Sequence, residues 1–493
     1  MIKRIGIHNF KAFGELHYID FSNLTLLSGL NSSGKSSIYQ VLLLLTQSFE
    51  SSRHERTGEV PILTLNGDLL QLGKKEEILN DQNTKSVRFD LLFTNNVELD
   101  LEFTLHTHST HGMHSEDFML TRLKFLNNRS GAKYDLKYNL KSNGWSIKAS
   151  SVLEISERSF ERVFHRHLKD VTPKDAVLYN PDVEFSEITG VTFFGYDLLS
   201  FKIKNEDLIQ CINPEYRDKL DIAKIKELYL KENNTEYNET HVTLENNYKI
   251  TNSNLLFRKD IKYIPPFRGY PRRFYTEGSI NNPLIEFNKH QNEKVKYHYD
   301  MEKKVANTSK LSEALHFWIV DQFKFAEEVK VDEAIPGYTS EIFLLKSNKK
   351  IPINNMGFGV SQILPIVFNL LQANSSRIFI VDEPEIHLHP EIQSKLADFF
   401  IHMALVGKTI ILESHSEYLI NSLVYYMVKY PHLKDSMKLY WVEQFQSSAK
   451  TKEITFDEFG FMDNAPMGFL TESESTTDKL NALRLQKMSK SNG

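Results

Sequence analysis

Apolar residues recur along this chain in two different periods, and the changes of period mark the predicted elements. Alternation of apolar and polar positions, with Val87, Phe89, Leu91 and Phe93 on one face, predicts half-buried strands over 2–7, 16–21 and 87–105. Consecutive apolar residues predict strands buried on both faces over 24–28, 378–381 and 409–412. Helical spacing predicts helices over 36–49, 311–325 and 391–405. This alternation of strands and helices predicts an α/β fold with a mixed or parallel sheet and flanking helices.

The middle of the chain follows neither period for long. Short strands are expected between 106 and 255, with helices near 154–169 and 215–232, and no repeat or flexible linker interrupts them. Polar and charged residues over 281–310 predict a helix or a mobile lid. We therefore expect a large α+β insertion into the main fold, with the parts 1–105, 106–255, 256–345, 346–435 and 436–493.

A glycine-rich segment follows the strand over 24–28 and precedes the helix that begins near Ser36. It reads G-x-x-x-x-G-K-S from Gly29 to Ser36, the pattern and context of a phosphate-binding loop. The glycines let backbone N–H groups point at phosphate oxygens, Lys35 bridges two phosphates, and Ser36 supplies a hydroxyl to Mg²⁺. The predicted nucleotide-binding residues are Gly29, Asn31, Ser32, Ser33, Gly34, Lys35, Ser36 and Ser37.

Two carboxylates end the apolar strand over 378–381. Asp382 and Glu383 stand before Pro384, at the carboxyl end of a predicted parallel strand, where ligands of α/β sheets bind. One carboxylate suits a hard cation and the other suits a water that needs a base. The simpler alternative is a buried strand that runs into an acidic turn.

A histidine ends the next apolar strand in the same way. His415 follows the strand over 409–412, which predicts a sensor of the γ-phosphate rather than a purely structural histidine. In the loop over 62–80, Gln71 is a candidate ligand of magnesium or of the attacking water, and a solvated loop glutamine is the alternative.

A second helix start with the character of an anion site lies before the acidic strand. Gly357, Gly359, Ser361 and Gln362 precede an apolar helix, and Pro365 is expected near its start. One nucleotide rarely needs two phosphate cradles in one chain. We therefore expect this segment to face the nucleotide of a second copy, in a homodimer or a higher homo-oligomer.

Two further clusters leave alternatives open. His106, His108, His111 and His114 resemble a metal cluster, or even a nuclease site, but they lack cysteines and metal-ligand spacing, so an exposed polar turn is favoured. Arginines 268, 272 and 273 are interleaved with aromatic residues. This segment predicts either a surface for nucleotide, DNA or RNA, or a loop held by arginine–carboxylate pairs.

Composition narrows the function classes. A net charge of −5 argues against a uniformly basic nucleic-acid binder. The single cysteine, Cys211, excludes an internal disulfide framework and a multi-thiolate metal site. No stretch approaches the roughly 18 to 20 apolar residues of a membrane span, and the N-terminus lacks an apolar signal core. We expect a cytoplasmic protein without a membrane partner.

The combined motifs resemble the ABC-type ATPase heads of chromosome-maintenance, recombination-repair and OLD-like proteins, over residues 1–80 and 255–470. The segment Gly29 to Ser36 looks like their Walker A motif, and Ile378 to Glu383 looks like Walker B with its catalytic glutamate. Residues 357–362 resemble a degenerate signature, and His415 the switch histidine. The closer resemblance is to prokaryotic single-head AAA-type members, which share the segments at 9–13, 264–268, 357–365, 382–390, 413–420, 454–460 and 466–469.

The resemblance implies an ABC-type P-loop head with an antiparallel β subdomain that takes ATP and Mg²⁺ and sandwiches two nucleotides in a dimer. It implies catalysis by Lys35, Glu383 and His415, and metal binding by Ser36 and Asp382. His387 and His389 would lie at the dimer seam rather than bind zinc. Compact relatives serve as ATPase subunits in anti-phage systems such as Septu or PARIS, with a nuclease or toxin on a separate chain.

Departures from the pattern restrict the functions that the resemblance implies. The chain has no long heptad arm and no acidic cluster of a Toprim nuclease after His415, and its signature lacks the usual serine-glycine-glycine order. The alternatives are an ATP-sensing scaffold with little turnover and a DNA repair or recombination ATPase. A transporter's ATPase subunit is disfavoured by the insertion and the weak signature.

Overall fold

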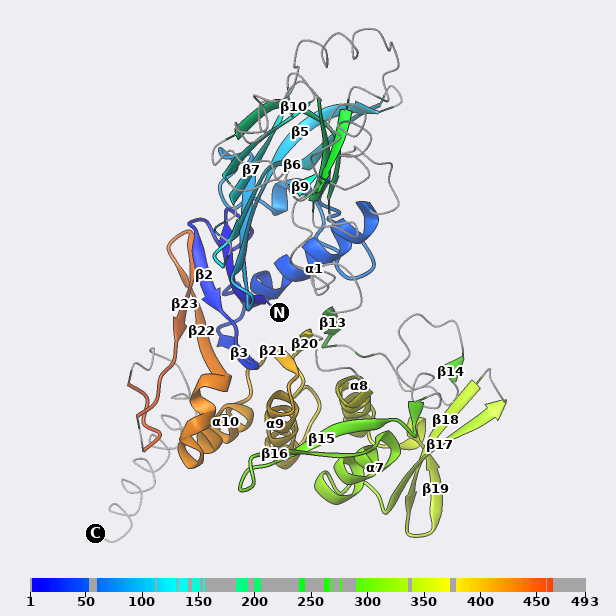
Figure 1. Cartoon of the computed structure of the whole chain (residues 1–493). Coiled ribbons are helices and arrows are strands. Elements are labelled where there is room, and N and C mark those ends of the chain that lie inside the picture. The colour runs from blue at the N-terminus through cyan, green and yellow to red at the C-terminus, as the bar shows by residue number, and fades with distance from the viewer. Residues whose placement is uncertain are drawn as a thin grey trace, which may run out of the picture. The chain divides into compact units, whose positions relative to one another are not determined.

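Two sheets of different character organise the chain, and each belongs to its own unit of structure (Figure 1). One unit consists of Met1–Asp20, Ser37–Asp260 and Gln446–Ser448, and the other of Phe21–Ser36, Ile261–Phe445 and Ala449–Gly493. The computed structural model describes residues 2–52, 60–110, 113–129, 131, 133–140, 144–150, 154–155, 183–193, 199–204, 239–243, 261–266, 268, 275–276, 290–335, 339–372, 378–457 and 459–463.

A six-stranded sheet forms the centre of the second unit. Its strands, in spatial order, are β13 (Ile261–Ile264), β20 (Ile378–Asp382), β21 (Thr409–Glu413), β3 (Leu24–Gly29), β22 (Met437–Phe445) and β23 (Ser448–Glu453). Neighbours from β13 to β22 pair in parallel. Every residue of β3, β20 and β21 is buried, as their unbroken apolar runs predict. The carboxyl ends of these three strands therefore meet at one edge of the sheet.

Helices with strongly apolar faces pack into the core of this unit. They are α8 (Phe358–Gln372), α9 (Pro390–Leu405) and α10 (Glu417–Lys429), and 3₁₀ turns η5 (Ile353–Asn355) and η6 (Pro431–Ser436) accompany them. The expectation that Pro365 lies near a helix start is wrong, because Pro365 lies inside α8. The apolar positions on both sides of Pro365 are buried in the core, and this packing keeps the helix continuous through the proline.

The segment before these helices corrects another prediction. Residues 294–310 form an antiparallel hairpin of β15 (Lys294–Asp300) and β16 (Val305–Lys310), so the expected helix or lid over 281–310 is wrong for the described residues from 290 on. Lysines stand between the apolar residues of β15 and make the segment look uniformly charged. Every second residue, Val295, Tyr297 and Tyr299, nevertheless packs against the core. The Tyr297 carbonyl also accepts a hydrogen bond from Trp318 Nε1 at 2.8 Å.

Short helical and strand elements complete the second unit. The helix predicted over 311–325 forms as α7 (Leu311–His316) followed by a π-helical turn, η4 (Phe317–Gln322). A small separate sheet contains β14 (Tyr275–Thr276), β17 (Glu328–Ile335), β18 (Thr339–Lys346) and β19 (Lys349–Pro352).

An eleven-stranded antiparallel sheet forms the first unit. Its spatial order is β2 (His17–Asp20), β1 (Ile2–His8), β4 (Ser86–Phe93), β5 (Val97–Thr110), β6 (Met113–Asn127), β7 (Lys133–Asn139), β8 (Gly144–Ser150), β10 (Val183–Phe193), β11 (Leu199–Lys204), β12 (Glu239–Thr243) and β9 (Glu154–Ile155). The boundary expected at residue 105 falls within β5. Together the two sheets and their helices confirm the predicted α/β class with an antiparallel β part.

Over β4, β5 and β6, one face of this antiparallel sheet is apolar and the other carries charges. The apolar run of α1 (Lys35–Ser52), residues 41–45, is fully buried, and Phe49 of this helix lies against Phe103 of β5. The loop predicted over 62–80 contains only the 3₁₀ turn η1 (Lys75–Glu77). Alternate residues of β4 point away from the buried face, as the period of two requires.

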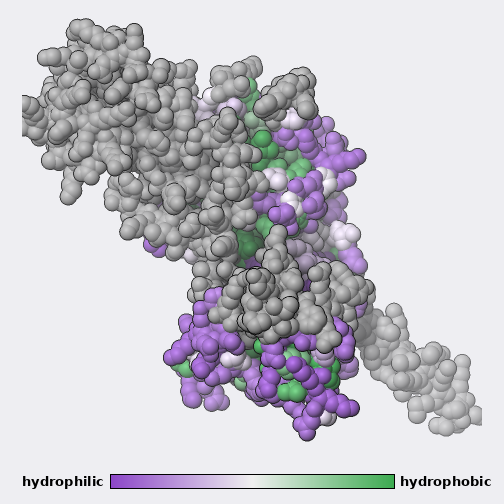
Figure 2. Space-filling model, turned by 90° about the vertical axis from the view of Figure 1, so that its right-hand side faces the viewer, coloured by the Kyte–Doolittle hydropathy of each residue, from purple (hydrophilic) through white to green (hydrophobic). Residues whose placement is uncertain are grey.

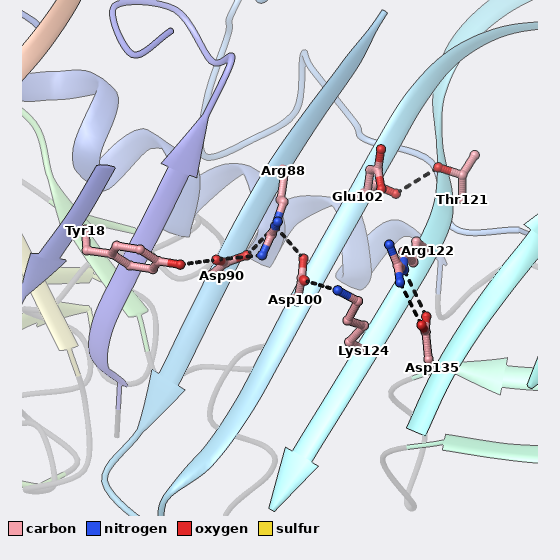
Figure 3. A network of polar contacts seen from close by, with 9 residues as sticks. All are labelled: Tyr18, Arg88, Asp90, Asp100, Glu102, Thr121, Arg122, Lys124 and Asp135. Carbon is pink, nitrogen blue, oxygen red and sulfur yellow. Dashed lines mark hydrogen bonds and ion pairs between the residues drawn. The ribbon is translucent and has the colours of Figure 1, made fainter. Parts of the chain in front are cut away.

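A row of polar contacts crosses the charged face (Figure 3). Tyr18 donates to Asp90 at 2.8 Å, and Arg88 Nε lies 2.8 Å from carboxylate oxygens of both Asp90 and Asp100. Lys124 continues the row, with 3.4 Å between its Nζ and Asp100. Burial and the Asp90 acceptor raise the pKa of Tyr18 to about 12. These cross-strand pairs keep the sheet face hydrophilic and fix its register.

The described surface is mostly hydrophilic in the view of Figure 2, with smaller hydrophobic areas between the polar ones. Among the described residues, no helix combines the length and apolar character needed to cross a membrane. The helix predicted over 154–169 is wrong at its first two residues, which form β9, and its remainder lies outside the described residues. Other predictions also lie outside them: the helix at 215–232, His111, Arg272, Arg273 and the segment 466–469.

Two histidine rings stack inside the second unit. His298 of β15 and His402 of α9 have ring centroids 4.1 Å apart at 25°, and the Tyr299 N–H donates to His402 Nδ1 at 3.2 Å. His402 is 7% exposed. Burial, and then the neighbouring His298, lower the pKa of His402 to about 3. The folded protein therefore holds this imidazole neutral.

We predict that His402→Asn makes the folded protein less sensitive to acid. An unfolded chain protonates His402 near its ordinary pKa of about 6.5, so the wild type loses stability as pH falls below that value toward 3. Asparagine keeps an acceptor for the Tyr299 N–H but takes up no proton. Melting temperatures between pH 7.5 and 5 measure the difference, with the exposed His432→Asn as control. Equal pH slopes for all three proteins would contradict the prediction.

Candidate functional site

The glycine-rich loop between β3 and α1 has the backbone that a phosphate cradle requires. Gly29 and Gly34 adopt φ angles of +149° and +103°, and Ser32 one of +61°. A Cβ on Gly29 would lie 2.1 Å from the Val442 carbonyl oxygen, so only glycine fits beside β22. Ser33 Oγ is buried in the loop without a hydrogen-bond partner in the described structure. A buried unsatisfied hydroxyl is costly, and a ligand oxygen at the loop would satisfy it.

The first two residues of α1 lie against a carboxylate that the sequence predictions do not include. Ser36 Oγ donates to Glu413 Oε2 at 2.9 Å, and Lys35 Nζ lies 3.7 Å from Glu413 Oε1. Lys35 Nζ also donates to the carbonyls of Gly29 and Leu30, at 3.2 and 2.8 Å. The side chains predicted to bind phosphate and magnesium therefore both face Glu413.

Burial dominates the electrostatics of this group. Lys35, Asp382 and Glu413 are 3%, 7% and 6% exposed. Burial lowers the pKa of the Lys35 ammonium, although Glu413 opposes the effect. Burial, with Asp382 second, raises the pKa of Glu413 to about 7. Burial therefore disfavours the charged forms of both Lys35 and Glu413, and the attraction between the two side chains does not offset the loss of their hydration.

Asp382 and Glu383 end β20 beside this group. Tyr263 of β13 donates to Asp382 Oδ2 at 3.1 Å, and Asp382 stands opposite Glu413 in the register of β20 and β21. Glu383 has a positive φ of 42°, and its N–H donates to the Glu413 carbonyl at 2.9 Å. This backbone turn leaves the Glu383 side chain half-buried at the sheet edge rather than inside the core.

Arg268 holds the backbone of the same turn through hydrogen bonds to its carbonyl groups. Its Nη2 donates to the carbonyl oxygens of Asp382 and Glu383, at 3.0 and 3.2 Å. Burial lowers the pKa of Arg268 to about 10, while the charge of Glu385 opposes that shift. Its Nε and Nη1 are buried without hydrogen-bond partners in the described part of the chain. Arg268 therefore holds backbone carbonyls rather than the carboxylates of the arginine–carboxylate alternative, and its part in a surface for nucleotide, DNA or RNA stays a prediction.

Glu385 fixes the segment that carries His415. Glu385 Oε1 accepts from Ser414 Oγ at 2.8 Å and from the His415 N–H at 2.7 Å. The His415 side chain itself is exposed. Partial burial, and then the positive charge of Lys35, lower the pKa of His415. The backbone is thus fixed by a buried carboxylate while the imidazole faces outward at the carboxyl end of β21.

The predicted signature residues divide into two groups. Ser361 and Gln362 are 6% and 2% exposed and belong to the interior of the protein. Gly357 is exposed, and a Cβ there would meet nothing within 4 Å, so the N-terminus of α8 is open at this residue. A Cβ on Gly359 would lie 2.9 Å from the His387 carbonyl oxygen. Gly357 is therefore the residue of this set with space for a ligand, and Gly359 permits close packing.

The other predicted residues have simpler surroundings. Asn31 and Ser32 are exposed on the loop, Ser37 is buried in α1, and His389 caps α9 by accepting from the Glu391 N–H at 3.3 Å. Gln71 belongs to the other unit and donates to the Gly67 carbonyl at 2.8 Å, so its magnesium role stays a prediction. His106 and His108 lie in β5 and His114 in β6. Within the described ranges, no group of three or more His, Cys, Asp and Glu side chains is arranged to hold a metal.

The residues of this edge fit a nucleotide with a divalent cation. The loop supplies an unsatisfied hydroxyl, Lys35 and the start of α1 to phosphates, which suits anions. The carboxylates of Asp382, Glu383 and Glu413 lie close enough to Lys35 to oppose the lowering of its pKa by burial, and this excess of negative charge suits a cation. Mg²⁺ commonly takes one or two protein carboxylates together with phosphates and water. Ser36 and Asp382 are the side chains of the predicted metal set that meet here.

Residues 1–420 match a model of the AAA ATPase domain. The chain belongs to this AAA ATPase domain family. Comparison of this AAA ATPase with curated proteins gives no match.

Solved structures similar to this AAA ATPase include heads of chromosome-maintenance proteins. A head bound to the C-terminal winged-helix domain of ScpA is 11% identical, with a TM-score of 0.37, 93% of this chain covered and 98% of that one. The head domain from Thermotoga maritima is 10% identical, with a TM-score of 0.36 and coverages of 92% and 99%. A head from Pyrococcus furiosus bound to the C-terminal domain of ScpA is 11% identical, with a TM-score of 0.34 and coverages of 98% and 99%.

Three side chains of the AAA ATPase site were missed from the sequence: Glu413, Tyr263 and Glu385. The sequence could have indicated Glu413 as a site residue, because it ends an apolar strand as Asp382 does. The sequence does not indicate the other two. The role of Tyr263 depends on β13 and β20 being neighbours, and that of Glu385 on its side chain turning back toward Ser414.

We predict that serine substitutions at the two glycines of the α8 start differ in effect. Gly359→Ser places a Cβ against the His387 carbonyl and should lower the free energy of unfolding by about 1–3 kcal/mol. Gly357→Ser meets open space at a cap position that favours serine, so its effect should stay within about 0.5 kcal/mol. Chemical denaturation measures both, and equal effects would contradict the close packing at Gly359.

Proposed function

We propose that this protein binds ATP with Mg²⁺ and hydrolyses it, as its family membership suggests. The observation that carries the proposal is the meeting of three strand ends. The loop after β3, the acids after β20 and His415 after β21 leave the sheet at one edge. Phosphoryl transfer to water needs a phosphate cradle, a cation site and a group that orients the water, and each has a candidate here.

Each residue has a role that its surroundings support. Lys35, the loop backbone and the start of α1 hold phosphate oxygens, and Ser36 and Asp382 are the side chains that hold Mg²⁺. When bound, Mg²⁺ neutralises charge on the phosphate oxygens. Glu383 projects from a turn held by Arg268, polarises the attacking water and accepts its proton. The exposed His415, on a backbone fixed by Glu385, contacts the γ-phosphate.

A second copy of the chain would complete this site. Gly357 opens the N-terminus of α8 to the outside, where backbone N–H groups and the helix dipole suit an anion. Leu30 in the phosphate loop is 64% exposed, and Asn31 and Ser32 next to it are exposed as well. An exposed loop on one copy and an open helix end on the other support a dimer with two sandwiched nucleotides. Closing it would exclude water and position the reacting groups.

We predict that Glu383→Gln lowers the rate of phosphate release from ATP at least about 100-fold, because glutamine cannot accept the proton. ATP binding should persist, since the phosphate loop is unchanged, and the ATP-bound dimer should last longer. A phosphate-release assay and light scattering with ATP and Mg²⁺ measure the two effects.

The exposed Glu302→Gln serves as the matched control and should behave like the wild type. Lys35→Ala should instead lose nucleotide binding itself. If the wild type binds ATP but releases no phosphate, the hydrolysis proposal fails and the alternative, an ATP-sensing scaffold, replaces it. If Glu383→Gln neither slows turnover nor prolongs the dimer, the sandwich mechanism is wrong.

We further propose that ATP turnover controls a separate effector, a nuclease or toxin, in anti-phage defence. The support is the resemblance of the segments at 9–13, 357–365, 382–390 and 413–420 to single-head defence ATPases. Co-expression with the product of the adjacent gene should yield a complex whose effector activity changes with ATP and with Glu383→Gln. Stimulation of turnover by DNA in the absence of such a partner would favour the repair-type alternative.

A further inference from the structure

Glu413 is the group at the site that the proposed function does not use. It lies on β21, opposite Asp382 on one neighbouring strand and Leu27 on the other, so its side chain is fixed by two parallel registers. It is 6% exposed. Burying a carboxylate here costs several kcal/mol unless a partner compensates, which calls for an explanation of its presence.

The contacts of Glu413 indicate what it does. Its Oε2 accepts the hydrogen bond of Ser36 Oγ at 2.9 Å, and its Oε1 lies 3.7 Å from Lys35 Nζ. A serine hydroxyl has one proton and two lone pairs. With the proton directed to Glu413, both lone pairs of Ser36 Oγ are left for another partner. A hydroxyl that binds a cation must present a lone pair to it, so this orientation is the one a metal ligand needs.

We propose that Glu413 is the positioning residue of the magnesium site: it holds the Ser36 hydroxyl proton so that the Ser36 oxygen faces the cation. This inference rests on the proposed function, since it concerns the cation that accompanies ATP. It adds a residue outside the phosphate loop and the Asp382–Glu383 pair. Outer groups of this kind orient the ligands of metal sites, and removing one typically weakens metal binding 10- to 100-fold.

The proximity to Lys35 gives Glu413 a second effect in the same direction. The charges of Glu413, Glu383 and Asp382 all act on the Lys35 ammonium. Glu413 also accepts the hydrogen bond of Ser36, so a single side chain of β21 contacts both Lys35 and Ser36 at the start of α1. Its removal should therefore disturb the metal dependence of nucleotide binding more than nucleotide binding in the absence of metal.

The test compares Glu413→Met and Glu413→Gln in the full chain, with a fluorescent ATP analogue that is not hydrolysed. The readout is the Mg²⁺ concentration that gives half of the metal-dependent increase in binding. Methionine removes the acceptor, so this concentration should rise about 10- to 100-fold. Glutamine keeps an acceptor oxygen for Ser36, so the shift should be smaller than with methionine. Binding measured in EDTA should stay within about threefold of the wild type for both variants.

A double-mutant cycle with Ser36→Ala tests whether Glu413 acts through that hydroxyl. The metal dependence of Ser36→Ala/Glu413→Met should match that of Ser36→Ala alone, because the two changes remove one interaction. Additive losses, equal shifts for Gln and Met, or an unchanged Mg²⁺ requirement in Glu413→Met would each overturn the inference. If Glu413→Met fails to fold, Glu413→Ala, which also removes the acceptor of the Ser36 hydroxyl, replaces it in the same cycle.

Failure of the proposed function gives a different pattern. If wild-type nucleotide binding neither requires Lys35 nor changes with Mg²⁺, the ATP–magnesium proposal itself is wrong and this inference falls with it. If Lys35→Ala abolishes binding and Asp382→Asn raises the Mg²⁺ requirement while Glu413→Met does not, only the role of Glu413 is refuted.

Discussion

The placement of β21 between β3 and β20 is the constraint on which the candidate site depends. Parallel pairing sets Glu413 opposite Asp382 on one side and Leu27 on the other. A shift of this register by one residue would turn every side chain of β21 to the opposite face of the sheet. Glu413 would then leave Ser36, and the backbone hydrogen bond from Glu383 to Glu413 would be lost. The residues of the phosphate loop contact the acidic side chains only because β3, β20 and β21 end at the same edge of the sheet.

The same sheet offsets the cost of the charges at its edge. Lys35, Asp382 and Glu413 are all nearly inaccessible, and taking such groups from water costs several kcal/mol each. Asp382 and Glu413 end β20 and β21, and Lys35 follows the loop after β3. These three strands are buried along their whole length, and their apolar area supplies stabilisation that the charged groups do not. The backbone carbonyls around Arg268 and Lys35 compensate part of the remainder. Groups held this way need little rearrangement when a ligand arrives, which is the usual condition for effective electrostatic catalysis.

Local patterns were sufficient to predict the buried strands β3, β20 and β21 and the helices α1 and α9. The loop over 29–36 and the acids at 382 and 383 are readable because strand, turn and helix signals coincide with the chemistry. The hairpin at 294–310 was missed because its lysines hide the alternation of Val295, Tyr297 and Tyr299. Arg268 was assigned the wrong kind of partner because its acceptors are the carbonyls of residues more than a hundred positions away. Glu413 was visible as a residue, but its partner Ser36 is brought to it only by the fold.

The contact between Gly359 and the His387 carbonyl has a thermodynamic consequence. The start of α8 and the turn that follows Glu383 touch without an intervening side chain, so neither can shift toward the other. A ligand at the open end of α8 that displaces this helix must also displace the turn. Any such binding event would then change the affinity of the proposed nucleotide site, and linkage would require the reciprocal change to be equal in size. A glycine without a side chain of its own thereby links two binding events that occur on different surfaces.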